Sequence, residues 1–316
     1  PPAARGTGLA LPSGMRETIG RLALPVLAAG AQFVVPAAAQ CPLGELLQGY
    51  GAQSAVEVDP ATGRVFTART HSIRVYEPTG ELALEFPHGG YSPRDLCVSR
   101  RNGDVYVLFN DRVRVFDRNG ASLYEFANGD PVKLWIGRAI DQSERTGRVY
   151  VAERLQGLVH VFEADGRHVR TFDGLFVVYD DPLGLAVSPV SDEVFVADPS
   201  TALVNVFDSL GTLLRTFGGY GVSPGKLVNP VGLDVAGVTG TVAVAERGLY
   251  TVSVFEPDGK FVARFGTSGT GPGKFPYPLG GVAFSDNGVL YVTGGDIEAF
   301  AQPPGPHCTA KASATG

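Results

Sequence analysis

Short runs of alternating hydrophobic and polar residues recur along most of the chain. The clearest copy is residues 204–217, in which an apolar run ending at Phe207 leads into an acidic turn that closes at Gly211, and a second apolar run ends at Phe217. β-Branched and aromatic residues with this alternation predict a β-hairpin, whose turn glycine supplies a positive φ angle. We therefore expect two antiparallel strands at each copy of the pattern.

The same hairpin pattern occurs at regular spacing in the rest of the sequence. Its turns are residues 75–80, 115–120, 161–166 and 254–259, and its second strands end at Phe86, Phe126, Phe172, Phe217 and Phe265. These phenylalanines follow one another at intervals of 40, 46, 45 and 48 residues. A period of this length is typical of β-propellers and repeat arrays.

Each repeat divides into four short strands, as residues 184–188, 193–197, 203–207 and 212–217 illustrate. Four strands in about 45 residues match one blade of a propeller. The first strands of the repeats align at residues 55–59, 96–98, 138–140, 185–187, 233–235 and 282–284. The sequence therefore predicts an all-β fold, a six-bladed β-propeller of four-stranded antiparallel blades over residues 40–301.

The sixth repeat stops after its third strand, near residues 296–300, and residues 44–50 resemble the missing outer strand. We expect this N-terminal strand to complete the last blade and close the ring, which removes exposed strand edges. Cys41 and Cys308 flank the repeats, so a Cys41–Cys308 disulfide is predicted for an oxidising compartment. Cys97 aligns with alanine in other repeats and is expected to be a buried thiol.

Residues 15–39 have the features of a secretory signal. Arg16 and Arg21 precede an apolar stretch at residues 22–35, and three alanines at residues 37–39 provide a cleavage site before Gln40. Residues 1–14 are then interpreted as upstream readthrough, and residues 302–316 as a tail or linker. The prediction is a protein secreted or on the exterior of the cell envelope, with lipid anchoring at Cys41 as the alternative to ordinary secretion.

The net charge and the lengths of the apolar runs argue against a nucleic-acid partner and against a membrane span. The formal net charge of −6 argues against a nucleic-acid partner, because phosphates require a basic surface. After residue 35, no apolar run approaches the roughly 20 residues that a membrane span needs.

The loops that enter the first strands carry large amphipathic rings, which suit recognition surfaces because they combine apolar area with a polar group. Five basic residues are expected on the same face as these rings: Arg69, Arg94, Lys133, Arg154 and Arg247. The predicted ligand-binding residues are Tyr50, Tyr91, Arg94, Trp135, Arg154, Tyr179, Tyr220, Arg247 and Tyr277. A peptide, protein or polysaccharide is the expected partner. The alternative interpretation is that each ring only covers its own loop.

Evidence for catalytic or metal chemistry is sparse. His71 and His88 are expected on the same face, and Glu57 and Asp234 on first strands, so these four are the candidates for a zinc or calcium site. We predict neither a cofactor nor catalytic residues. Residues 269–274 share glycines and a lysine with phosphate-binding loops, but Phe275 follows where Ser or Thr is required, so an interblade turn is predicted.

Finally, the repeats resemble the NHL repeat. Residues 217–255 and 265–300 are the best copies, and Val194–Asp198 and Val149–Glu153 carry its middle segment. The resemblance covers roughly residues 43–300 and implies a propeller. NHL-like propellers include extracellular sensors, protein- and RNA-binding modules and a few lyases, some of which hold zinc with histidines of several blades. Recognition without catalysis is our prediction, and a metal-dependent lyase or lactonase-like enzyme over the central channel is the alternative.

Overall fold

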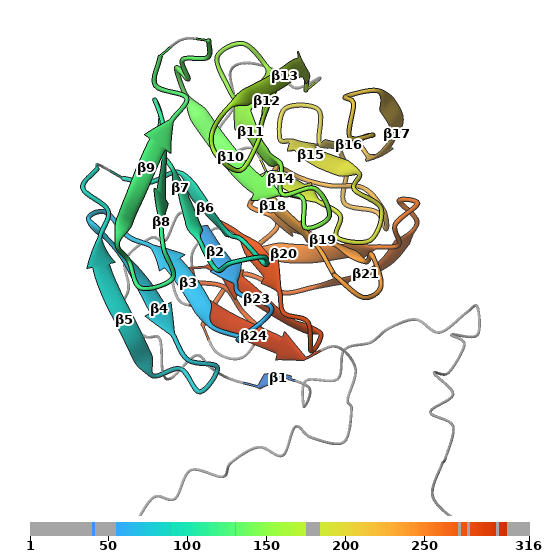
Figure 1. Ribbon diagram of the computed structural model, residues 1–316. Coiled ribbons are helices and arrows are strands. Elements are labelled where there is room, and N and C mark those ends of the chain that lie inside the picture. The colour runs from blue at the N-terminus through green and yellow to red at the C-terminus, as the bar shows by residue number, and fades with distance from the viewer. Residues whose placement is uncertain are drawn as a thin grey trace, which may run out of the picture. The chain divides into compact units, whose positions relative to one another are not determined.

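Six blades surround a central axis in the computed structural model (Figure 1). The structure describes residues 40–41 and 55–301, apart from 91, 130, 175–183, 271–272, 277–278 and 295–296. These described residues form six four-stranded antiparallel sheets and no helix. The predicted six-bladed β-propeller is confirmed.

In the first five blades the strands follow one another in chain order from the innermost strand outward, and in the sixth the first strand of the chain takes the outermost place. The first three blades consist of β2 (Ala55–Val58), β3 (Val65–Ala68), β4 (Ser72–Tyr76) and β5 (Leu82–Pro87); β6 (Asp95–Val98), β7 (Val105–Leu108), β8 (Val113–Phe116) and β9 (Ser122–Phe126); β10 (Gly137–Gln142), β11 (Val149–Glu153), β12 (Leu158–Phe162) and β13 (His168–Asp173). The last three consist of β14 (Gly184–Val187), β15 (Val194–Asp198), β16 (Leu203–Phe207) and β17 (Leu213–Gly218); β18 (Pro230–Val235), β19 (Val242–Glu246), β20 (Thr251–Phe255) and β21 (Phe261–Phe265); and β22 (Val282–Phe284), β23 (Val289–Thr293) and β24 (Ile297–Ala301) with β1 (Gln40–Cys41).

Burial falls from the inside of a blade to its outside. Every residue of β7 and β11 is buried, whereas most residues of the outer strands β5 and β17 are exposed or half-buried. An inner strand lies between two neighbouring blades, so both of its faces are covered and it reads as a continuous apolar run. The hydrophobic core is accordingly divided into six clusters, each shared by two adjacent blades.

The periodic phenylalanines hold adjacent blades together. The closing phenylalanine of each outer strand packs on a phenylalanine of the next blade, with ring centroids 4.8–5.3 Å apart, in the pairs Phe86–Phe116, Phe126–Phe162, Phe172–Phe207, Phe217–Phe255 and Phe265–Phe300. The turn glycine of the next blade lies against the same ring. A Cβ at Gly166, for example, would stand 2.7 Å from Phe126 Cβ and Cγ. The hairpin motif therefore encodes both a turn and a contact between blades.

Gly166→Ala should destabilise the propeller by about 2–3 kcal/mol, because Gly166 has a φ of 85° and its Cβ would overlap Phe126. Gly129→Ala is the matched control, since Gly129 has no positive φ and nothing within 4 Å of an added Cβ. Denaturant unfolding measures both variants. Equal midpoints for the two variants would contradict the assigned contact.

An N-terminal strand closes the ring, as predicted. Its residues are Gln40 and Cys41, which pair antiparallel with Phe300 and Ala299 of β24. The strand expected at residues 44–50 lies outside the described residues and stays a prediction. Cys308 also lies outside them, and the predicted disulfide with Cys41 stays a prediction.

Cys97, in contrast, is a buried free thiol on β6, as expected from its alignment with alanine.

Candidate functional site

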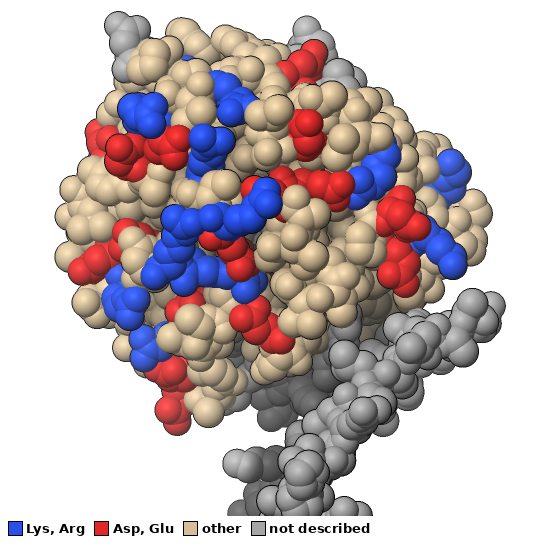
Figure 2. All heavy atoms as spheres, turned by 45° about the vertical axis from the view of Figure 1, so that its right-hand side comes forward, with Lys and Arg blue, Asp and Glu red and all other residues tan. Residues whose placement is uncertain are grey.

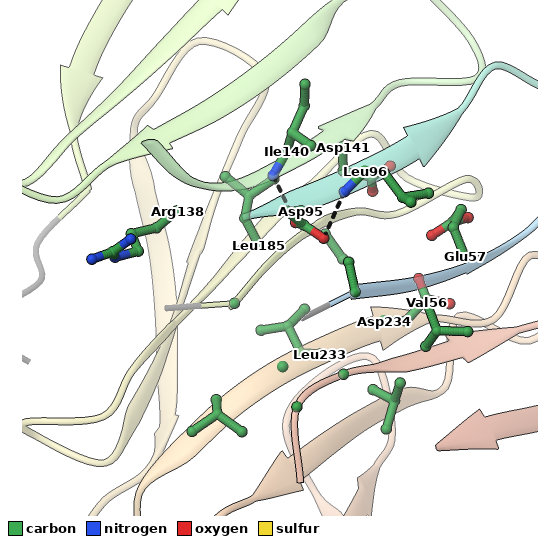
Figure 3. Close-up of a pocket in the computed structure, with 18 of the residues that line it drawn as sticks. Val56, Glu57, Asp95, Leu96, Arg138, Ile140, Asp141, Leu185, Leu233 and Asp234 are labelled. Carbon is green, nitrogen blue, oxygen red and sulfur yellow. Dashed lines mark hydrogen bonds between the residues drawn. The ribbon is translucent and has the colours of Figure 1, made fainter. Parts of the chain in front are cut away.

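The innermost strands of all six blades line a central channel that contains two voids. The larger void is ≈ 580 Å³ including its part open to solvent, and the smaller is ≈ 370 Å³. Three carboxyl side chains, those of Glu57, Asp141 and Asp234, line both voids. They occupy the same position of β2, β10 and β18, so they come from alternate blades. Figure 3 shows them together at one end of the larger void.

The aspartates of the channel connect neighbouring blades through backbone hydrogen bonds. Asp141 accepts the N–H of Gln142 on its own strand at 2.6 Å and the N–H of Val187 on the next blade at 2.7 Å. Asp234 likewise accepts the N–H groups of Val235 and Phe284, at 2.7 and 2.6 Å. Each carboxyl group therefore satisfies one donor on either side of a blade interface.

Asp95 repeats this arrangement two residues earlier on β6. It accepts the N–H groups of Leu96 and Ile140, both at 2.9 Å (Figure 3). The interfaces between blades two and three, three and four, and five and six are thus each joined by an aspartate. Buried backbone donors need acceptors, and the carboxyl groups supply them where no strand pairing crosses from blade to blade.

Burial raises the pKa values of these carboxyl groups. The pKa is raised to about 7 for Asp95, about 8 for Asp141 and about 6 for Asp234, although the backbone N–H bonds oppose the shift in each case. For Glu57 the pKa is raised well above its ordinary value, by burial first and then by the negative charges of Asp234 and Asp141. The channel therefore holds several carboxyl groups that exchange protons near neutral pH, and they titrate as a cluster.

Arg100 closes the end of the channel that the smaller void occupies. Its guanidinium forms an ion pair with Glu144 of blade three and another, at 2.7 Å, with Asp286 of blade six. Its positive charge lowers the pKa values of Glu57 and Asp234 and so opposes part of the effect of burial. The chain thus provides its own cation beside the buried carboxyl groups.

The opposite end of the channel is an asymmetric mouth. Arg94 and Arg138 line the larger void from blades two and three; Arg138 is only 8% exposed, and Arg94 Nε donates to Asn110 Oδ1 at 2.7 Å. On the side of blades four to six the lining consists of glycines and apolar residues, and Gly184 and Gly232 lie so close together that a Cβ at Gly184 would be 3.0 Å from the Gly232 Cα. One side of the mouth is therefore basic, and the other side is uncharged.

Two of the six predicted aromatic residues are described, and both are exposed. Trp135 precedes β10 and is 54% exposed, with Lys133 Nζ 5.0 Å from its ring centroid, and Tyr220 lies between β17 and β18 and is 80% exposed. The residues outside the described part are Tyr50, Tyr91, Tyr179 and Tyr277. Trp135 and Tyr220 both lie in loops that enter first strands, as predicted.

Of the three predicted arginines, Arg94 alone lines the void. The backbone N–H of Arg154 donates to Ile136, next to Trp135, and that of Arg247 donates to Asn229, both at 2.9 Å. The sequence interpretation missed Arg138, although residues 138–140 were correctly placed on a first strand. Figure 2 shows positive and negative side chains next to one another over the visible surface.

The four metal candidates do not form one cluster, because the two histidines lie in loops and the two carboxyl groups lie in the channel. His88 is buried, with Nε2 2.9 Å from the Arg69 carbonyl oxygen and Nδ1 accepting the Gly90 N–H at 3.2 Å. His71 is exposed, whereas Glu57 and Asp234 line the channel. Among the described residues, no three His, Cys, Asp or Glu side chains are grouped so as to hold a metal ion.

Two buried glutamates support the loops next to the channel. Glu153 accepts the Leu155 N–H at 2.7 Å, and Glu246 accepts the Val228 N–H at 2.8 Å and forms an ion pair with Arg264 of β21 at 3.0 Å. Both carboxylates are almost completely buried.

Comparison with known protein families gives no match to this sequence, and comparison with curated proteins gives no relative. The fold is established by the structure alone. No helix of the described residues is long and apolar enough to cross a membrane.

Proposed function

We propose that this propeller is an exported recognition module of the NHL-repeat type that binds a peptide or protein partner without catalysis and without a cofactor. The observation that supports it is the mouth of the larger void, where Arg94 and Arg138 lie on one side and exposed Trp135 precedes the strand that carries Arg138. Arginine binds carboxylates with two parallel hydrogen bonds, and tryptophan contributes a large apolar contact. The partner is expected to present a carboxylate beside an apolar residue.

The test uses an array of short peptides and oligosaccharides, each synthesised with and without a carboxylate, probed with the tag-free full chain. We expect binding to carboxylate-bearing peptides, and Trp135→Ala and Arg94→Gln should each weaken it about 10-fold or more. Leu210→Ala and Arg118→Gln are matched controls, because they change exposed residues on the turns at the other ends of the strands. Selective binding of neutral oligosaccharides, or unchanged affinity of both mouth variants, would contradict the proposal.

A lyase or lactonase-like activity in the channel is the second candidate. It is supported by the carboxyl groups with pKa values near neutrality, which suit general acid–base catalysis in a concave site. A panel of lactones and esters, assayed with zinc or calcium added and then with a chelator, tests it. Turnover that Glu57→Gln abolishes would favour the enzyme over the recognition module.

A further inference from the structure

Two histidines on blade three point at one hydroxyl group. His160 Nδ1 on β12 lies 2.8 Å from Thr171 Oγ1, and His168 Nε2 on β13 lies 2.9 Å from the same atom. The ring centroids of the two histidines are 6.3 Å apart. Two imidazole nitrogens therefore converge on a single point outside the channel and outside its mouth.

The corresponding cross-strand position in three other blades holds an arginine beside an acceptor. It holds the ion pairs Arg74–Glu85 at 3.0 Å and Arg114–Glu125 at 3.1 Å in blades one and two, and in blade five the Arg264 Nε donates to Ser253 at 2.9 Å. In blade three no cation occupies this position, and one hydroxyl group faces two imidazoles, donating its single proton to one of them and accepting an N–H from the other.

Phe162 lies beside both rings, with its centroid 6.4 Å from that of His160 and 5.6 Å from that of His168. His168 is half-buried on the outer strand of the blade, where water reaches it.

We propose that His160 Nδ1 and His168 Nε2 form a site for a divalent transition-metal ion, Zn²⁺, Ni²⁺ or Cu²⁺, at the outer edge of blade three. Imidazole nitrogens favour these ions over Ca²⁺ and Mg²⁺, which prefer oxygen ligands. Metal–nitrogen bonds of about 2.0–2.1 Å are shorter than the 2.8 and 2.9 Å that separate these nitrogens from Thr171 Oγ1, so the two rings move closer together around an ion that displaces the hydroxyl group. The threonine side chain rotates away, and water completes the coordination.

The experiment is calorimetric titration of the tag-free full chain with ZnCl₂ and with NiCl₂ at pH 7.5, followed by Cu²⁺ titration with electron paramagnetic resonance. We expect one ion bound per chain by nitrogen ligands. His168→Gln should weaken binding about 10-fold or more, because one of two protein ligands is lost. His160→Asn should weaken binding to a similar extent. If this substitution of a buried residue prevents folding, His168→Gln, which changes a half-buried residue, still tests the proposal.

Two further variants separate the site from other histidines and from a structural role of the hydroxyl group. His71→Gln removes an exposed histidine of blade one and should leave the affinity unchanged. Thr171→Val should bind at least as tightly as the wild type, because it removes the hydroxyl group that occupies the metal position. Absence of binding by the wild type, or equal affinities of wild type and His168→Gln, would overturn the proposal.

Discussion

Replacing Asp141 with alanine should lower the free energy of unfolding by about 3–5 kcal/mol at pH 7. The substitution leaves the N–H groups of Gln142 and Val187 without their acceptor inside the channel, and each unsatisfied buried donor costs about 1–3 kcal/mol. A cavity where the carboxyl group stood adds to this loss. Because the two donors belong to blades three and four, the change weakens an interface between blades and not a single strand. Denaturant unfolding at constant pH measures the effect.

Asp165→Ala is the control for Asp141→Ala. Asp165 also accepts a backbone N–H, that of Arg167 at 2.9 Å, but in an exposed turn where water can replace it. We expect this control to cost less than about 1 kcal/mol. If the two variants unfold at the same denaturant concentration, the carboxyl groups of the channel do not join the blades, and their raised pKa values need another explanation.

The local pattern of the sequence was sufficient to predict the fold. The hairpin motif repeats because every blade needs the same turn, and Phe126 and Gly166 are both periodic since the ring of one blade packs on the turn of the next. The positions of the first strands were also recovered, although β10 (Gly137–Gln142) and β18 (Pro230–Val235) are longer than the predicted ranges 138–140 and 233–235. The pairing of Gln40–Cys41 with β24 was not predicted, because a two-residue strand carries no pattern of its own.

The candidate site was recovered only in part, since its residues become neighbours only when the ring closes. Glu57 and Asp234 were recognised as first-strand carboxyl groups, but Asp141 occupies the equivalent position and was missed. Its alignment with Glu57 and Asp234 was the available signal. Arg100 gave no signal, because its partner Asp286 lies 186 residues away in the sequence. Arg138 was placed on the correct strand, although nothing in the sequence indicated that it lines a void.

The stability of the wild type should decrease as the pH rises from 6.5 to 8.5. Asp95 and Asp141 have folded pKa values of about 7 and 8, above their ordinary value of 3.8, so in this range the folded state binds more protons than the unfolded state. Stability then falls with increasing pH, by at most about 1.4 kcal/mol per pH unit for each titrating proton. His160 has the opposite effect, because its folded pKa of about 4 makes stability increase with pH, but only below about pH 6.5.

Asp141→Asn isolates this contribution. The carboxamide retains the shape of the side chain and one acceptor oxygen but cannot ionise. The unfolding midpoint of the Asp141→Asn variant should therefore decrease less from pH 6.5 to 8.5 than that of the wild type. Some decrease should remain, because Asp95 still titrates. Asp165→Ala, which changes an exposed carboxylate, should show the full wild-type decrease. A wild-type midpoint that is constant or rises over this range would mean that the channel carboxyl groups are already ionised in the folded state. In that case Arg100 alone would balance a permanently negative channel, and the protons inferred there would be absent.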